Sequence, residues 1–572
     1  MRNRVIRNNR LEILLSLAIV AICILNLWRL YGPLIVPDEV GYWATGYFFS
    51  GYNWSGVMGT SSYYGWGYGV VLAIICRIAP SPVFAFRVAI FLNSILLVGC
   101  FILAIKVFKY VFPDISHAYR TWMCFAITVY SGYIYYSQTT YCETLILFLY
   151  WLALYLLMKI IDKKSYLYII LLALDIAYLG AVHLRTILIF VVAVLVLLFL
   201  AIKKELSYKQ LVVFGTICIL LLLGVWEVKN YLSNTLYRTS ILLETNNVSG
   251  QLDKLSILFS WEGIKQFVGS FVGKVLYAGT ATFLLVYVSA FCCLEKMKKV
   301  YIKKKELFST YELVFILFVF NGFICELLLS SYSLLTYGRI DHIIYGRYTE
   351  FLLGAIILYA LGNLYIKLEK KILFLSIATQ VICTMVVYRF IVNKDYLGTP
   401  SAYTIPGIKG IYTPNGLDPK IQLTLYVSGI SIIIFTVIYL MFHLKNKCIV
   451  LVGVSVLWIG IALNCASNSL YAEQQYQEKD YLKFANSVAK IIGSDDVFYI
   501  INDTEYVSWL KFKLKFFLPK TNMIAYESAE YAKVDSGEYL ILYNNDSYYD
   551  EIMDTLGDKV YASEFFSLYR KE

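Results

Sequence analysis

Carboxylate and guanidinium side chains stand beside several long apolar runs in this sequence of 572 residues. Asp38 and Glu39 follow the first run, Glu143 opens another, and Arg185 and Arg347 lie next to two more. An ionisable group beside a lipid-embedded segment is costly to desolvate, so each is a candidate for function. A carboxylate can take a proton from a hydroxyl, and a guanidinium can neutralise a phosphate leaving group. These residue types therefore suit transfer of a group from a phosphate carrier to a hydroxyl.

The same neighbourhoods contain His183, Glu350 and Arg339 as further candidates. Each candidate also has a purely structural interpretation. The acidic residues could accept orphan backbone N–H groups at helix starts. The arginines could extend to lipid headgroups, and His183 could be a satisfied interfacial histidine. Asp175 and Glu326 lie inside apolar runs, where we expect them to be internal hydrogen-bonding groups.

The composition indicates that membrane helices must position these side chains. The chain is 59% hydrophobic and 16% charged, with a mean hydropathy of +0.65, which leaves too little charged surface for a soluble globular protein. Its net charge of +11 comes from Lys and Arg in short loops between apolar runs. That placement is a topology signal and predicts a cytoplasmic N-terminus rather than a nucleic-acid partner.

We expect a mainly α, polytopic membrane protein with about thirteen spanning helices, which puts the C-terminus outside the cytoplasm. The spans are predicted near 11–30, 84–106, 120–137, 143–160, 166–182, 185–202, 210–226, 271–293, 311–330, 347–366, 372–392, 421–442 and 448–466. Long external segments are then 31–83, 227–270, 331–346 and 393–420. Within the first, Tyr68–Ile78 is too short to span and is predicted to lie at the outer interface.

Near residue 470 the composition changes, because charged residues become frequent and the apolar runs shorten to strand length. We therefore divide the chain into a transmembrane domain, 1–469, and a small extracytoplasmic α/β domain, 470–572. Strands are predicted at 497–501, 539–543 and 559–562, and helices near 473–492, 503–517 and 547–556.

The acidic residues and their positions resemble the GT-C superfamily of membrane glycosyltransferases. The acidic pair in PDEVGYWATGYFF resembles that superfamily's motif in the first external loop, and YYGWGYGVVLAIICRIAPSPVFAFRVA resembles its interfacial segment. Glu143 resembles the acidic residue before the fourth helix of protein O-mannosyltransferases and lipid A aminoarabinose transferases, where Asp is more frequent. LGAVHLRTILIF resembles the segment that carries a basic residue after the fifth helix. The resemblance covers roughly residues 11–230.

This resemblance implies a glycosyltransferase that uses a polyprenyl-phosphate-linked hexose or pentose donor from the outer leaflet. Asp38 would be the general base of an inverting displacement, and Glu39 would orient it. Arg185 and Arg347, with His183, would bind the donor phosphate. Glu143 would bind the acceptor or, together with Asp38, a divalent cation (Mg or Mn), because some members of the superfamily need a metal and others do not.

The acceptor is expected to be an extracytoplasmic cell-surface glycan, a lipid or a protein. The retained basic N-terminus and the Lys-rich inner loops are compatible with a multi-pass protein of a bacterial cell membrane, and surface polysaccharide or cell-wall decoration is the expected process. Three alternatives stay open: a transporter or flippase of polyprenyl-linked glycans, a polysaccharide polymerase or ligase of different fold, and a non-catalytic scaffold. A transporter would show internal repeats and charges near the midplane, whereas the charges here flank the outer ends.

Overall fold

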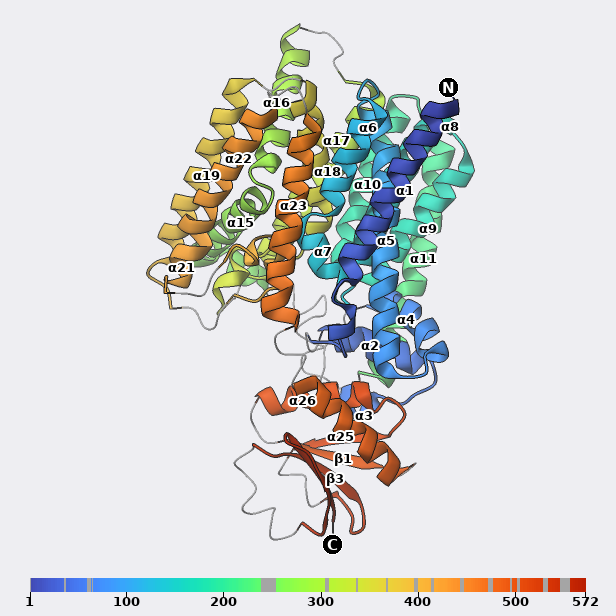
Figure 1. Ribbon diagram of the computed structural model, residues 1–572. Coiled ribbons are helices and arrows are strands. Elements are labelled where there is room, and N and C mark those ends of the chain that lie inside the picture. The colour runs from blue at the N-terminus through green and yellow to red at the C-terminus, as the bar shows by residue number, and fades with distance from the viewer. Residues whose placement is uncertain are drawn as a thin grey trace.

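The computed structural model describes residues 2–34, 38–58, 63, 65–237, 254–303, 308–335, 338–366, 369–395, 400–412, 416–442, 447–471, 477–493, 496–501, 505–527, 533–545 and 556–571. Long helices run side by side through most of the molecule, and a small unit with a β-sheet lies at one end (Figure 1). The two termini lie at opposite ends of the molecule.

The first part of the chain supplies the helices that carry the acidic residues. They are α1 (Arg2–Ile24), α2 (Asp38–Phe49), α3 (Ser55–Met58), α4 (Gly67–Ile78), α5 (Pro82–Val111), α6 (His117–Thr128), α7 (Ser131–Ser137), α8 (Glu143–Lys163), α9 (Tyr166–Val182), η2 (Leu184–Thr186), α10 (Ile187–Ile202) and α11 (Tyr208–Thr235).

The second part continues the bundle. Its helices are α14 (Lys254–Leu258), α15 (Trp261–Ala281), α16 (Leu285–Lys303), α17 (Thr310–Ser333), η3 (Ile340–His342), α18 (Glu350–Ile366), α19 (Lys370–Ile391), α20 (Pro406–Lys409), α21 (Pro419–Ile421), α22 (Val427–Phe442) and α23 (Lys447–Ala466). A π-helical segment, Ser467–Tyr471, extends α23 across the expected domain division at 469/470.

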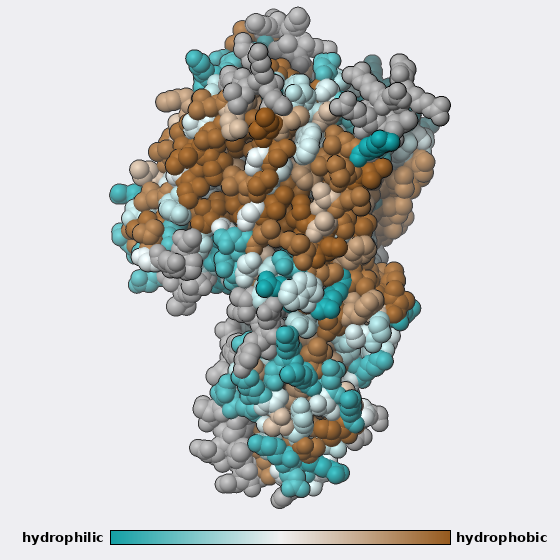
Figure 2. All heavy atoms as spheres, viewed as in Figure 1, coloured by the Kyte–Doolittle hydropathy of each residue, from teal (hydrophilic) through white to brown (hydrophobic). Residues whose placement is uncertain are grey.

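Nine described helices are long and apolar enough to cross a membrane, or ten if the bent pair α15 and α16 counts as one span. Three shorter apolar helices are α4, α9 and α18. Every predicted span falls on described helical segments, two of them on a pair of helices, and the count of about thirteen stays a prediction. Figure 2 shows hydrophobic residues covering the helical part and hydrophilic ones around the small unit, as expected for a lipid-facing bundle with a water-facing end.

Two predicted spans are interrupted. The segment predicted at 120–137 is two helices, α6 and α7, and the segment predicted at 271–293 bends by 103° between α15 and α16. At the bend, Phe283 and Leu284 have φ angles of 48° and 61°. Two successive left-handed residues cannot continue a right-handed helix, so the chain changes direction there.

The small unit contains α25 (Gln477–Ile492) and α26 (Glu505–Phe517) together with a five-stranded mixed sheet in the order β2-β1-β3-β5-β4. The strands are β1 (Val497–Ile501), β2 (Met523–Glu527), β3 (Tyr539–Tyr543), β4 (Lys559–Ala562) and β5 (Phe566–Arg570). Strand β1 is parallel to both of its neighbours, β2 and β3, while β5 pairs antiparallel with β3 and β4. The three predicted strands are confirmed, and β2 and β5 were not predicted. The helix predicted at 547–556 falls, up to residue 555, outside the described residues.

This unit packs on α2 and the residues that follow it through α26. The rings of Phe516 and Trp43 meet edge to face with centroids 5.2 Å apart. Lys515 donates a hydrogen bond to the Thr521 carbonyl at 2.5 Å, and its Nζ lies 5.3 Å from the centre of the Trp54 ring. The helix that follows the acidic pair is therefore held from both sides, by the bundle and by the small unit.

Candidate functional site

Four of the predicted site residues converge in an ion-pair cluster, which we call the charge cluster: Asp38, Glu143, Arg185 and Arg347. Arg347 donates from Nε to Glu143 Oε1 at 2.6 Å and from Nη1 to Asp38 Oδ2. Arg185 donates from Nη2 to the same Glu143 oxygen at 3.0 Å. The residues come from four separate segments, so the bundle brings together what the sequence shows apart.

Helix ends position both carboxylates of the charge cluster. Asp38 lies in the first turn of α2, and Glu143 is the first residue of α8. Carboxylates are stabilised at helix N-termini, where unpaired N–H groups and the helix dipole favour negative charge. Arg185 lies in η2, the turn between α9 and α10, and Arg347 lies just before α18. Among the described residues the contacts of Asp38 and Glu143 are ion pairs with the two arginines, so the capping role considered from the sequence stays a prediction.

The charge cluster has one member open to the outside. The Asp38 side chain is 17% exposed, whereas the Arg347 side chain is 5% exposed and those of Glu143 and Arg185 are 4% and 2% exposed. Asp38 is thus the more exposed of the two carboxylates. The two arginines lie behind it.

Both arginines keep N–H groups for a further partner. Within the described residues, Arg347 Nη2 and Arg185 Nε and Nη1 have no hydrogen-bond partner. The Arg347 guanidinium lies 4.3 Å from the centre of the Tyr141 ring, and Arg185 lies 5.1 Å from that of Tyr348. Burial by itself would lower the pKa of Arg347, but the Glu143 and Asp38 carboxylates raise it well above its usual range. Two permanent cations with free donors suit a phosphate group.

Glu39 has a different environment from Asp38. Its Oε1 accepts hydrogen bonds from the Thr140 backbone N–H at 2.6 Å and from the Thr140 hydroxyl at 2.9 Å, and its Oε2 accepts one from Leu34 N–H at 2.8 Å. Trp43 Nε1 also donates to the Thr140 hydroxyl at 2.9 Å. Glu39 is 1% exposed. It ties the first external segment to the residues that lead into α8.

Glu350 lies behind the charge cluster and accepts hydrogen bonds from the hydroxyls of Tyr277 and Tyr130. A cavity of about 10 Å³ separates Glu350 from Glu143. Three polar atoms without a partner among the described residues belong to side chains that line it: Glu143 Oε2, Thr144 Oγ1 and Glu350 Oε2. That volume holds about one water molecule, which needs two to four polar partners.

The structure places His183 and Arg339 outside the ion pairs of the charge cluster. His183 Nδ1 accepts from the Arg185 backbone N–H at 3.2 Å and so caps the turn that carries Arg185. Arg339 pairs with Asp341 at 2.6 Å and contacts the hydroxyls of Ser401 and Tyr403. These contacts make Arg339 a link between two segments, 338–347 and 400–412.

Sequence reasoning missed Asp341 and the two tyrosines under the arginines. Asp341 also accepts from the Ser401 backbone N–H at 2.8 Å and from the Thr404 hydroxyl at 2.7 Å. Tyr141 and Tyr348 stand within two residues of Glu143 and Arg347, and that adjacency was the available signal. With 51 Tyr in the chain, aromatic content alone could not single them out.

Asp38 and Glu143, the expected metal ligands, are not arranged to bind a divalent cation. Asp38 and Glu143 both meet the Arg347 guanidinium, which occupies the position between them. Within the described part of the chain, no group of three His, Cys, Asp or Glu side chains is placed to hold a metal ion. We therefore derive no step through a metal.

The sequence matches no protein-family model and no curated protein. The fold, however, is similar to that of solved structures. Two crystal structures of ArnT from Cupriavidus metallidurans are similar to it. The structure bound to undecaprenyl phosphate has a TM-score of 0.55 and 11% identity, over 97% of each chain. The apo structure has a TM-score of 0.54 and 11% identity, also over 97% of each chain.

Proposed function

We propose that this protein transfers a sugar from a polyprenyl-phosphate-linked donor to a hydroxyl of an extracytoplasmic acceptor. The observation that carries the proposal is the charge cluster, in which one accessible carboxylate stands in front of two buried guanidinium groups with free N–H donors. The resemblance to GT-C glycosyltransferases supports it, and one structure of similar fold binds undecaprenyl phosphate. A bacterial cell membrane and a cell-surface glycan, lipid or protein acceptor complete the proposal.

The reaction we propose is a single displacement at the anomeric carbon. Asp38 takes the proton of the acceptor hydroxyl while the acceptor oxygen forms its bond to the anomeric carbon. The bond between that carbon and the phosphate oxygen breaks, and the electron pair leaves with the phosphate. Arg347 and Arg185 neutralise the charge that develops on the phosphate. Attack opposite to the leaving group inverts the configuration, and the proton ends on Asp38.

Glu143 and Glu39 have positioning roles in this proposal. Glu143 holds both guanidinium groups through one oxygen, which fixes their separation and the direction of their free N–H groups. Glu39 fixes the start of α2 through Thr140 and Leu34, so that Asp38 keeps its place. Preorganised charge of this kind contributes more than the same groups free in water, because nothing reorganises during the reaction.

The test is sugar transfer in membranes supplied with a polyprenyl-phosphate-linked sugar pool, at matched expression. Asp38→Asn keeps the shape of the side chain but cannot take the proton, so we expect transfer to fall by about 10²–10⁴-fold. Asp162→Asn is the matched control, because Asp162 pairs with Lys159 at the far end of α8. Transfer by the control should equal that of the wild type.

Unchanged transfer in Asp38→Asn would contradict the proposed base. Absence of any transfer by the wild type, with movement of the intact lipid-linked sugar across the membrane instead, would replace the proposal with a flippase. Loss of transfer in the Asp162→Asn control would mean that the assay reports insertion or folding rather than chemistry.

A further inference from the structure

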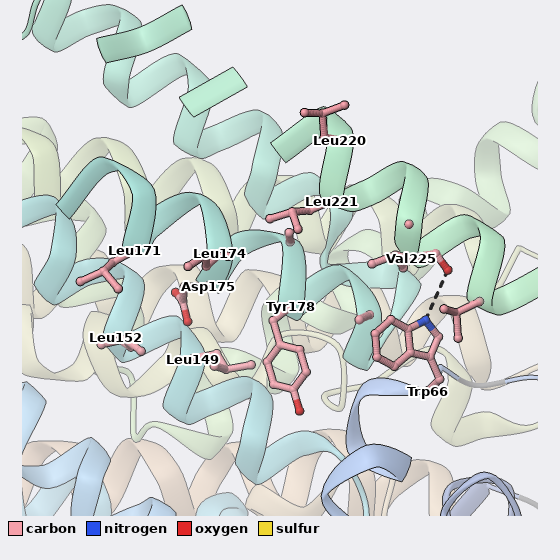
Figure 3. Close-up of a pocket in the computed structure, with 14 residues that line it drawn as sticks. Trp66, Leu149, Leu152, Leu171, Leu174, Asp175, Tyr178, Leu220, Leu221 and Val225 are labelled. Atoms are coloured by element: carbon pink, nitrogen blue, oxygen red, sulfur yellow. Dashed lines mark hydrogen bonds between the residues drawn. The ribbon is translucent and has the colours of Figure 1, made fainter. Parts of the chain in front are cut away.

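An apolar pocket of about 700 Å³ runs along the lipid-facing side of α8, α9 and α11. Figure 3 shows Leu149 and Leu152 on one side of it, Leu174 on another, and Leu220 and Val225 on the third. Leu220 is 63% exposed, so the pocket opens where the bundle faces hydrocarbon. Its volume lies within the range of about 300–1,000 Å³ that is typical of ligand pockets.

The charge cluster does not include the one carboxyl group in this pocket. Asp175 is only 5% exposed, and neither of its carboxyl oxygens has a hydrogen-bond partner among the described residues. Figure 3 shows its carboxyl group between Leu174 and the leucines of α8. A carboxyl group buried in an apolar environment without a partner is costly, and such groups inside a membrane mark functional sites.

Hydrogen bonds of Trp66 and Tyr178 hold the outer end of the pocket together. Trp66 donates from Nε1 to the Val225 carbonyl at 3.3 Å, and its backbone N–H donates to the Ala181 carbonyl at 3.1 Å. Tyr178 donates to the Gly67 carbonyl at 3.0 Å. Gly65 has a φ of 127°, and a Cβ there would come within 2.3 Å of the Val182 carbonyl oxygen. The start of α4 therefore closes the pocket at the level of the outer interface.

We propose that this pocket binds the aliphatic chain of a membrane lipid that carries a hydroxyl or amide group along the chain, and that this group hydrogen-bonds Asp175. The apolar walls suit a chain, and the carboxyl group needs a polar partner at the depth of α9 where Asp175 lies. A polyprenyl chain is pure hydrocarbon and would leave Asp175 unpaired. A helix of a partner protein is about 10–12 Å wide and does not fit inside this volume. The proposal goes beyond the proposed transferase and does not depend on it.

The chain offers a matched pair of variants for a test. Gly224 lines the pocket and Gly215 does not, although both lie on α11. A Cβ at either position has no neighbouring atom within 4 Å, so Gly224→Phe and Gly215→Phe should both fold. Only Gly224→Phe places a ring in the pocket. Asp175→Leu removes the polar group and keeps the walls apolar.

The measurement is the amount of lipid that the purified full-length protein retains, by native mass spectrometry. The probes are a phosphatidylcholine with a mid-chain hydroxyl, the same lipid without it, and polyprenyl phosphate. We expect the wild type to prefer the hydroxylated chain by roughly three- to tenfold, the effect of one hydrogen bond. Asp175→Leu should lose this preference, Gly224→Phe should lose retention, and Gly215→Phe should match the wild type.

Equal retention of the hydroxylated and plain lipids by the wild type would overturn the proposal. So would displacement of both by polyprenyl phosphate, which would assign the pocket to the donor chain. Retention in Gly224→Phe equal to that of the wild type would show that the bound lipid lies elsewhere. None of these measurements uses transferase activity, so failure here leaves the proposed function untouched, and the reverse also holds.

Discussion

Arg347 joins two carboxylates from distant parts of the chain, and its place among them explains why the charge cluster is stable. A buried charge without a partner is strongly destabilising, whereas paired charges with additional hydrogen bonds are tolerated. Two arginines and two carboxylates balance each other within the charge cluster. Within the described residues, three guanidinium N–H groups of the charge cluster are buried without a hydrogen-bond partner.

The small cavity between Glu143 and Glu350 leads to a prediction about bound water. The direction of the stability change in one variant shows whether a water molecule bridges the polar atoms that line it. Thr144→Val keeps the side-chain shape and removes the hydroxyl. If one water bridges the three polar atoms, we expect the variant to lose about 1 kcal/mol of stability, because the water loses a partner. Thermal unfolding of the purified protein in one detergent measures the difference. A stabilised Thr144→Val variant would show that no water links these groups.

The hydrogen bonds of Asp341 lead us to expect that the stability of the segments 338–347 and 400–412 depends on pH. Burial would raise its pKa, but its hydrogen bonds from Arg339 and Thr404 and the Arg339 charge lower it below its usual value. Its stabilising contribution is therefore complete above the pKa of about 3.9 of an unfolded Asp, and it is lost as the pH falls further through the lowered folded pKa.

Hydrogen exchange of 338–347, measured from pH 6 downward, reports this loss. After correction for intrinsic exchange rates, protection in the wild type should fall only below about pH 4. Asp341→Asn cannot titrate and should show low, flat protection over the same range. A wild type that stays fully protected at pH 2 would contradict the assignment.

The sequence located most of the charge cluster because ionisable residues beside apolar runs are rare. Asp38, Glu143, Arg185 and Arg347 each stand at a run boundary, which a linear pattern reveals. The partners of Glu39 could not be predicted in this way. Thr140 is far from Glu39 in the chain and becomes its partner only when the two segments approach each other, and Leu34 contributes an ordinary backbone N–H that no residue pattern marks.

At the scale of elements, apolar runs predicted the long helices, but α2 was not predicted as a helix. Its sequence, DEVGYWATGYFF, is short and contains two glycines. The structure shows that glycines let α2 and α4 pack closely: a Cβ at Gly69 would lie 2.6 Å from Thr45 Cγ2, and one at Gly46 would lie 2.9 Å from Leu72 Cβ. Strands β2 and β5 were also missed, although β5 pairs with the adjacent β4 as well as with β3.

We expect a glycine-to-alanine substitution to change stability in opposite directions at two sites. Gly69 lies in the close contact between α2 and α4, whereas Gly453 lies in α23. Gly69→Ala must push α2 away and displace Asp38, so we expect lower stability and transfer. Gly453→Ala, in α23, has no atom within 4 Å of the new Cβ and should be stabilising by about 0.5–1 kcal/mol. Thermal unfolding and sugar transfer of both variants measure the contrast. Full transfer by Gly69→Ala would show that the position of α2 does not matter.

At the scale of the whole molecule, the C-terminal unit supports the first external segment. Phe516 packs on Trp43, Trp43 donates to the Thr140 hydroxyl, and that hydroxyl donates to Glu39. This series of contacts leads from α26 to Thr140, which precedes α8, and to Glu39, the neighbour of Asp38. A change at Phe516 should therefore act on the charge cluster without touching any of its members.

Phe516→Ala and Phe498→Ala form a matched pair for this prediction. Both side chains are buried in the C-terminal unit, but Phe498 belongs to a separate cluster on β1 and stacks on Tyr526. Each substitution should cost about 3–5 kcal/mol of the unit's stability. Only Phe516→Ala should also lower kcat, with KM for the acceptor little changed. Equal effects of the two variants on kcat would contradict a positioning role.

The contact between Trp43 and Phe516 also has a consequence for biosynthesis. The chain is made from its N-terminus, so Asp38 and Glu39 are synthesised well before Phe516. A chain that has grown past Arg347 but not as far as Phe516 holds all four members of the charge cluster, yet it lacks the contact between Phe516 and Trp43. We expect chains that stop before Phe516 to lack the proposed activity.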